Sequence, residues 1–329
     1  MARNAPGKHH RKGLSIVELM DLFPNDEEAE RWFTKTRWPE GVRCPKCGCD
    51  NIQERATRKP QPYRCRGCRK DFSVKTDTLM HSSPLGFRIW VIAIFLATTN
   101  IKGIASMKQH RDLKVTQKTA WHLAHRIREA WNDEETMFAG PAESDSTFIG
   151  GKRKNMSKAK RKELREAGAG RGAVGKAEVV GVKDRSTGRI AARRAARSDI
   201  PHVAGFVAEK VRLGAKVYTD DAKVYGALGP WFDHEAVNHS VGEYVRQQAH
   251  TNGIESFWAM LKRGYQGVFH KFSEKHLDRY VVEFSGRHNI RNLDTIDMMR
   301  SLAVRMVGKR LRYRDLIADN GLPSGARGG

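Results

Sequence analysis

Two Cys-x-x-Cys pairs in the N-terminal quarter constrain the fold of this chain more than any other feature. Cys44 and Cys47 form the first pair, Cys65 and Cys68 form the second, and seventeen residues separate the pairs. Four thiolates at this spacing are typical of a structural zinc site, in which the sulfurs converge on one tetrahedral ion. We therefore expect these four residues to bind Zn²⁺ and the surrounding chain to fold as a zinc ribbon.

The fifth cysteine, Cys49, follows the first pair directly, so all five cysteines lie within residues 44–68. We expect Cys49 to be a spare thiol, although its position would also allow it to replace Cys47. A thioredoxin-like redox pair is the alternative, but it needs a single Cys-x-x-Cys in a βαβ setting. Gly48 and Gly67 are expected to supply the permissive backbone that metal-binding knuckles use.

The charge of the chain indicates a polyanionic partner. Lys and Arg number 60 against 37 Asp and Glu, which gives a formal net charge of +23. Nucleic acid is the most common partner of so basic a protein, although charge alone does not identify it. The most apolar stretch, residues 89–97, is far shorter than the ~20 residues that cross a bilayer, and the basic N-terminus lacks the apolar core of a secretory signal. We expect a cytoplasmic protein with no membrane contact.

Hydrophobic periodicity and composition divide the chain into five regions. After residue 141, strand-like runs alternate with helical patterns, which indicates an α/β domain with a mixed sheet. Between its first two strands, residues 152–176 are rich in Lys and Arg and then in Gly, and we predict a mobile loop there. The predicted regions are a disordered basic tail (1–13), a helical segment plus zinc ribbon (14–80), a helix-turn-helix-like region (81–135), a catalytic α/β domain (140–300) and a C-terminal tail (301–329).

The region before the α/β domain has the pattern of a helix-turn-helix. A first helix is predicted over 101–109, a turn over 110–115, and a second helix over 117–131 with Thr116 as its N-cap. Proteins that read DNA place such a second helix in the major groove, although a plain helical hairpin fits this pattern nearly as well. The basic surroundings and the neighbouring zinc ribbon favour DNA binding. The exposed faces of the second helix are predicted to carry Lys118, His122, Arg126 and Arg128.

Three carboxylates occupy positions at which a metal-dependent active site could form. Asp145 and Asp220 lie in strand-like runs, and Glu255 begins a helical pattern. Carboxylates from different elements can hold two Mg²⁺ ions, which activate the attacking oxygen and stabilise the leaving oxygen in phosphoryl transfer. Taken singly, each of these residues is more often a helix cap or a surface residue. Asp221 directly follows Asp220, and the apolar run closes at Asp220.

The sequence resembles a known family over most of its length. The segment HTNGIESFWAMLKRGYQGVFHKFSEKHLDRYVVEFSGRHNIR resembles the C-terminal signature of the DDE transposases of bacterial insertion sequences, in the subgroup with an N-terminal zinc ribbon. AESDSTFIGGK and VYTDDAKVY resemble the first and second Asp motifs of that subgroup, in the expected order and spacing. With the zinc ribbon included, the resemblance spans roughly residues 20–295. One departure is Ser146, where the family usually has a second acidic residue.

The resemblance implies a ribonuclease-H-like fold and a DNA transposase that cleaves DNA and transfers strands with Mg²⁺ or Mn²⁺. It maps the catalytic triad onto Asp145, Asp220 and Glu255. It also makes Lys262 a candidate active-site residue that holds a DNA phosphate, since Lys262 lies two helical turns after Glu255 on the same face. The implied partners are double-stranded DNA, at the terminal inverted repeats and at the target, and further copies of the chain assembled on DNA in the nucleoid.

Two other functions stay open from the sequence. A zinc-ribbon and helix-turn-helix transcription regulator would bind DNA without catalysis, but it would need no acidic triad. A ribonuclease-H-like nuclease acting on hybrids or junctions would cut without joining, but it would need no sequence-reading region at the N-terminus.

Overall fold

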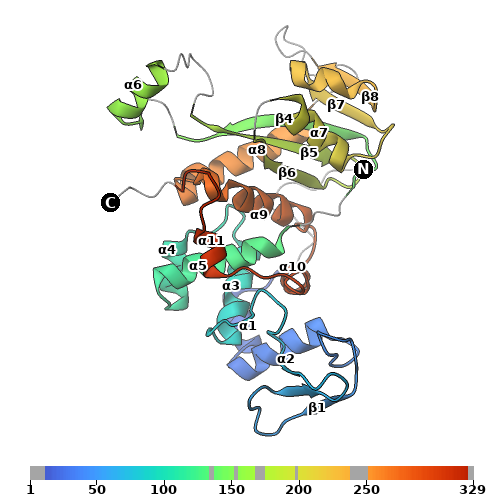
Figure 1. The fold of residues 1–329 in the computed structure, drawn as a ribbon, viewed down its shortest axis with the longest axis vertical. Helices are drawn as coiled ribbons and strands as arrows, with labels where there is room; N and C mark the ends of the chain where they lie inside the picture. Colours follow the sequence, from blue (N-terminus) through green and yellow to red (C-terminus); the bar gives the residue numbers. More distant parts are fainter. Residues whose placement is uncertain are drawn as a thin grey trace. The chain divides into compact units, whose positions relative to one another are not determined.

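A computed structural model describes residues 12–132, 137–151, 155–166, 175–196, 199–237 and 251–324. The predicted basic tail, residues 1–13, lies almost entirely outside these residues. The chain forms two compact units (Figure 1). The first unit contains Met1–Trp131 and Ile290–Ala318, and the second contains Asn132–Asn289 and Asp319–Gly329.

The first unit begins with two short helices, α1 (Ile16–Leu22) and α2 (Asp26–Arg37). The apolar pattern predicted helical structure over this stretch, and the chain breaks it near Pro24 into two pieces. Ser15 and Asn25 form the N-caps, because the side chain of each accepts a hydrogen bond from a first-turn N–H.

A three-stranded antiparallel sheet follows α2. Its strands are β1 (Ile52–Glu54), β2 (Tyr63–Cys65) and β3 (Asp71–Phe72), in the order β1-β2-β3. Phe72 is buried with two of the cysteines, and the half-buried ring of Trp38 meets it edge-on at 6.0 Å between ring centroids. A core this small leaves much of the stability of the ribbon to the metal site.

Three helices complete the N-terminal part of the first unit: α3 (Phe87–Thr99), α4 (Ser106–Leu113) and α5 (Gln117–Ala130). Helix α3 is buried along most of its length, as its continuous apolar run predicts. No helix in the part of the chain that the structure describes has both the length and the apolar character that crossing a bilayer requires.

The C-terminal helices α10 (Thr295–Val304) and α11 (Tyr313–Ile317) belong to this first unit. The catalytic domain predicted from the sequence extends to residue 300 and is followed by a tail, and the structure differs on both points. Helix α10 packs against α2 and α3, because Met299 and Leu302 on its apolar face are fully buried there.

The second unit is built on a five-stranded mixed sheet in the order β6-β5-β4-β7-β8. The first three strands in sequence pair antiparallel, while β7 runs parallel to β4, and β8 runs parallel to β7. The sequence predicts a hairpin of residues 179–183 and 188–193 joined by residues 184–187, and the β5–β6 pairing confirms it, whereas β8 is not predicted. The strands are β4 (Ala142–Ile149), β5 (Ala177–Asp184), β6 (Ile190–Arg194), β7 (Lys216–Asp220) and β8 (Asp233–Val237).

Helices cover both faces of this sheet (Figure 1). Val180 and Val182 of β5 pack toward α7, while Val179 packs toward α8 and α9, as the alternation of side chains along a strand requires. A mixed sheet between helical layers agrees with the predicted ribonuclease-H-like fold. The helices are α7 (Ile200–Lys210), the 3₁₀ helix η2 (Lys223–Leu228), α8 (Asn252–Gly264), the π-helical turn η4 (Tyr265–Phe269), the 3₁₀ turn η5 (Glu274–His276) and α9 (Leu277–Asn289).

The connection between β4 and β5 contains a further helix, α6 (Lys158–Glu166). The sequence predicts a mobile loop over 152–176, and this prediction is wrong for the residues that form α6. Lys, Ala, Arg, Glu and Leu are all strong helix formers, and Leu164 lies beside Gly175 at the far end of the connection. Basic side chains such as Lys162 are exposed along α6.

Candidate active site and zinc site

The four cysteines of the two pairs come together at one point. The sulfurs of Cys44, Cys47, Cys65 and Cys68 all lie within 4.8 Å of one another. The Cys44–Cys68 and Cys47–Cys65 Sγ distances are both 3.6 Å. A zinc–sulfur bond of ~2.3 Å with tetrahedral geometry sets the sulfurs about 3.8 Å apart, so the cluster fits one zinc ion. The Cys68 N–H donates to the Cys65 sulfur and lowers the pKa of that thiol to about 6, which favours the thiolate that a metal binds.

Each knuckle turns through a residue with a left-handed backbone directly after its second cysteine. These residues are Gly48, with φ 74°, and Arg69, with φ 58°. The prediction that Gly67 has this conformational role in the second knuckle is wrong. Space is tight at Gly67, because an added Cβ would lie 3.2 Å from the sulfur of Cys49. Cys49 itself lies outside the four-sulfur cluster.

In the second unit, Asp145 and Asp220 lie on neighbouring parallel strands at the same level of the sheet. Strand β4 pairs with β7 through Glu143 and Tyr218, and continuing this register by two residues sets Asp145 opposite Asp220. Trp258 of α8 donates its indole N–H to Asp145 Oδ2 at 3.0 Å, so this side chain faces α8. Side-chain alternation places Asp220 on the same face.

Glu255 lies in the first turn of α8, the helix that crosses this face of the sheet. The hydroxyl of Thr251 donates to Glu255 Oε1 at 2.7 Å and orients the carboxylate. Helix α8 is fixed to the sheet through its buried residues, among them Ile254, Trp258 and Leu261. Glu255 is therefore exposed on a helix whose other side is anchored.

The electrostatics of Asp145 connect all three carboxylates. Loss of solvation and the negative charge of Asp220 raise the pKa of Asp145 to about 7, and Glu255 adds a smaller contribution in the same direction. Hydrogen bonds from the Ser146 N–H, at 2.7 Å, and from Trp258 act in the opposite direction. Repulsion among neighbouring carboxylates is relieved when a divalent cation binds between them.

The carboxylates are less tightly gathered than the thiols. Among the described residues, the four cysteines form the only group of three or more potential ligands whose atoms all lie within 4.8 Å. Lys262 is exposed on α8, two turns after Glu255, as predicted from the helical repeat. Asp221 is exposed beyond the last residue of β7, while Asp220 is within the strand and half-buried.

Two residues that were not predicted to belong to this site contact its carboxylates. They are Thr251, which bonds Glu255, and Trp258, which bonds Asp145. The Trp258 ring lies over Gly181, the β5 partner of Asp145, because a Cβ added there would be 2.7 Å from the ring. The helical repeat offered one signal, since Thr251 and Glu255 are four residues apart and face the same side.

The predicted helix-turn-helix is present in the first unit with changed boundaries. The first helix, α4, begins at Ser106 rather than at Ile101, and the turn is reduced to the residues between α4 and α5. Lys114 ends α4 in a left-handed conformation with φ 54°. Thr116 caps α5 by accepting a hydrogen bond from the Thr119 N–H, as predicted.

Helix α5 is more buried than its sequence indicated. Arg126 and Arg128, predicted to be exposed, are 9% and 4% exposed. Arg126 donates to the backbone carbonyls of Leu311 and His81, because the C-terminal segment of the chain returns across this side of α5. Of the predicted basic residues, only Lys118 is fully exposed.

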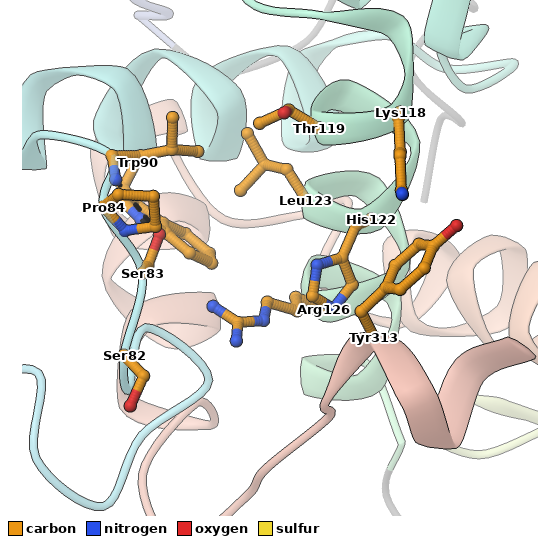
Figure 2. Close-up of a pocket in the computed structure, with 11 residues that line it drawn as sticks. Ser82, Ser83, Pro84, Trp90, Lys118, Thr119, His122, Leu123, Arg126 and Tyr313 are labelled. Carbon is orange, nitrogen blue, oxygen red and sulfur yellow. Dashed lines mark hydrogen bonds between the residues drawn. The ribbon is translucent and has the colours of Figure 1, made fainter.

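A cavity of about 240 Å³ opens beside the N-terminal half of α5 (Figure 2). The ammonium of Lys118 lies 4.6 Å from the ring centroid of Tyr313, and His122 meets the same ring edge-on. Trp90 lines the opposite wall, and the side chain of Arg126 extends into the space between the walls. Basic and aromatic side chains are groups that contact nucleic-acid phosphates and bases.

Comparisons with known proteins agree with this architecture. Residues 137–289 match the family model of the ISXO2-like transposase domain, and residues 24–71 match that of a transposase zinc-ribbon domain. Together with the fold and the four-cysteine site, these matches define the chain as a DNA transposase, an enzyme that cleaves and transfers DNA.

More narrowly, the chain is a transposase of the insertion-sequence type with an N-terminal zinc ribbon. The family resemblance predicted from its sequence motifs is therefore confirmed. It is 28% identical over 278 residues to a protein of Halobacterium salinarum described as an uncharacterized protein in transposable element ISH50. The match covers 82% of this chain and 92% of that protein. No solved structure matches the chain.

Proposed function

We propose that this transposase holds two divalent metal ions with Asp145, Asp220 and Glu255 and uses them to cut and join DNA. The observation that carries this proposal is the placement of the two aspartates opposite each other on parallel strands, beneath the helix that carries the glutamate. The pKa of Asp145, raised to about 7 by burial and by its acidic neighbours, supports it further. Perturbed carboxylates of this kind are typical of catalytic sites.

When bound, Mg²⁺ or Mn²⁺ would activate the attacking oxygen and stabilise the oxygen that leaves the scissile phosphate. The chain presents the carboxylates for this purpose, and the Trp258 and Ser146 N–H groups orient the two oxygens of Asp145. Water attacks first and releases a 3′-hydroxyl at the element's end. That hydroxyl then attacks a phosphodiester of the target DNA. Lys262, exposed on the same helix as Glu255, is placed in this proposal against a DNA phosphate.

We assign the reading of the terminal inverted repeats to the first unit. The exposed basic residues that could read DNA are Lys114, at the end of α4, and Lys118, in the first turn of α5. Recognition helices contact base edges through their N-terminal residues, so the burial of the later part of α5 is compatible with this role. Phosphate contacts are assigned to the basic zinc ribbon and to the exposed basic side chains of α6.

The assembly of the protein and its place in the cell follow from its DNA substrate. A transposition reaction joins two element ends to one target, so we expect two or more copies of the chain to assemble on DNA. We also expect the protein to act in the cytoplasm, in association with the nucleoid that contains its substrate.

A joining assay with a labelled element end, a target duplex and Mg²⁺ tests this function. The wild-type protein should cleave the end and join it, whereas a nuclease would only cut and a regulator would only bind. Asp145→Asn, Asp220→Asn and Glu255→Gln should each abolish both steps and retain end binding. Asp221→Asn should be milder, because Asp221 lies beyond the strand. Near-normal cleavage by Glu255→Gln would refute the proposed metal site.

A further inference from the structure

A buried carboxylate outside the proposed triad contacts the elements that carry it. Glu143 lies on β4 two residues before Asp145, so both side chains project from the same face of the sheet. Glu143 is only 2% exposed. Its Oε1 accepts a hydrogen bond from Arg185 Nε at 2.9 Å, and its Oε2 accepts one from the backbone N–H of Ile254, also at 2.9 Å.

The second of these bonds attaches the start of α8 to the sheet. The Ile254 N–H belongs to the first turn of α8, where it is shared between Glu143 Oε2 and the backbone carbonyl of Thr251 at 3.1 Å, and Glu255 is the next residue. At Gly253 an added Cβ would lie 2.6 Å from Glu143 Oε2 and 2.5 Å from Lys183 Nζ. Glycine at residue 253 therefore lets the helix approach the carboxylate this closely without displacing the ends of the Glu143 and Lys183 side chains.

The hydrogen bond from Arg185 to Glu143 connects this cluster to β7, the strand that carries Asp220. The guanidinium of Arg185 lies 4.0 Å from the ring centroid of Tyr218. Tyr218 is the β7 partner of Glu143 and precedes Asp220 by two residues. Glu143, Arg185 and Tyr218 thus form a layer of contacts one pleat below Asp145 and Asp220.

Stability alone is a weak reason for this arrangement. The desolvation of a buried ion pair commonly offsets its attraction, and well-packed apolar residues can replace it at little cost. An apolar side chain could not accept the Ile254 N–H, however, and so could not tie the first turn of α8 to β4. Metal ligands must be held within about 0.5 Å of their working positions, and the start of α8 sets the position of Glu255.

We propose that Glu143 is a positioning residue, which holds the first turn of α8 against β4 and thereby sets Glu255 in place beside Asp145 and Asp220. The inference rests on the proposed metal site for its functional consequence. The contact between Glu143 and α8 can be tested in the protein without any metal ion.

The decisive variants are Glu143→Ala, which removes both acceptors, and Glu143→Gln, which keeps one neutral acceptor. The matched control is Glu178→Gln, since Glu178 is also buried on a neighbouring strand but belongs to the α7 face. Hydrogen exchange followed by mass spectrometry should show the amides at the start of α8 exchanging at least about tenfold faster in Glu143→Ala, with the sheet unchanged. Glu143→Gln should restore most of the protection, and the control should match the wild type.

Metal affinity provides the functional readout. Titration of the full-length protein with Mn²⁺, followed by electron paramagnetic resonance, should show binding at least about tenfold weaker in Glu143→Ala, because residues that orient metal ligands have effects of this size. Partial rescue by Glu143→Gln is expected, and saturating Mn²⁺ should recover cleavage. Wild-type exchange at α8 and wild-type Mn²⁺ affinity in both variants would overturn the positioning role. If Asp145→Asn also binds Mn²⁺ normally, the metal site itself is wrong, and the exchange result still decides whether Glu143 holds α8.

Discussion

Replacing Asp145 by Asn should stabilise the metal-free protein at neutral pH, although it removes the proposed activity. The pKa of Asp145 is raised from 3.8 to about 7 by burial and by the charge of Asp220. Between these values the unfolded chain loses the proton and the folded chain keeps it. The free energy of unfolding therefore falls as pH rises through this window, and this loss is absent when residue 145 cannot ionise.

The size of the effect follows from the shift. A difference of roughly 3 pKa units corresponds to ~4 kcal/mol at pH 8, and this is an upper figure because the half-buried side chain can relax toward solvent. Asn keeps one oxygen for the indole N–H of Trp258, but its NH₂ group cannot accept the Ser146 N–H, and the loss of that hydrogen bond reduces the gain by about 1 kcal/mol. For a unit of this size, such a change raises the melting temperature by on the order of 10 °C.

Scanning calorimetry of both proteins without added Mg²⁺, at pH 4.5 and at pH 8, measures this effect. The variant should melt higher than the wild type at pH 8, and its advantage should be much smaller at pH 4.5, near the start of the pH window over which the wild type loses stability. Asp221→Asn, which changes an exposed carboxylate, is the control and should follow the wild type at both pH values. Added Mg²⁺ should stabilise the wild type more than Asp145→Asn. An equal difference between the proteins at both pH values would refute the reasoning, because the carboxyl would then not be the titrating group.

Three further results are expected. Elemental analysis should find one zinc per chain, which Cys65→Ser removes and Cys49→Ser retains; loss of zinc from both variants would place Cys49 among the ligands. Gly181→Ala should reduce cleavage by at least about tenfold with end binding unchanged, because its Cβ would lie 2.7 Å from the ring of Trp258 and displace the hydrogen bond to Asp145. Normal cleavage by this variant would show that Trp258 is not needed there. Neutralising the exposed basic residues of α6 should make DNA binding less sensitive to salt. The slope of log K against log salt concentration should become less negative by ~0.9 for each phosphate contact that is lost. An unchanged slope would exclude α6 from the interface. The residues to change to Gln are Lys158, Lys162 and Arg165.

The features predicted correctly from the sequence depend on short-range patterns. The zinc ligands occupy a span of only 25 residues, from Cys44 to Cys68, and their spacing alone indicates a tetrahedral site. The β5–β6 hairpin and the cap of α5 by Thr116 are similarly local. Strand β8 was missed because its sequence, DHEAV, has little apolar character; as an edge strand it forms by pairing with β7 and not by burying an apolar face.

The sequence by itself determined which residues are chemically able to form the two sites, since their types and order are read directly from the chain. Only the tertiary structure decided where distant segments pack. Helix α10 shows an apolar face in the sequence, but hydrophobic burial has no direction, so the pattern could not tell that this face covers α2 and α3. Glu143 reads as an ordinary strand residue until β7 and α8 are brought beside it. Its bonds to Arg185 and to the Ile254 N–H join residues 42 and 111 positions apart, and contacts at such separations leave no periodic trace in a sequence.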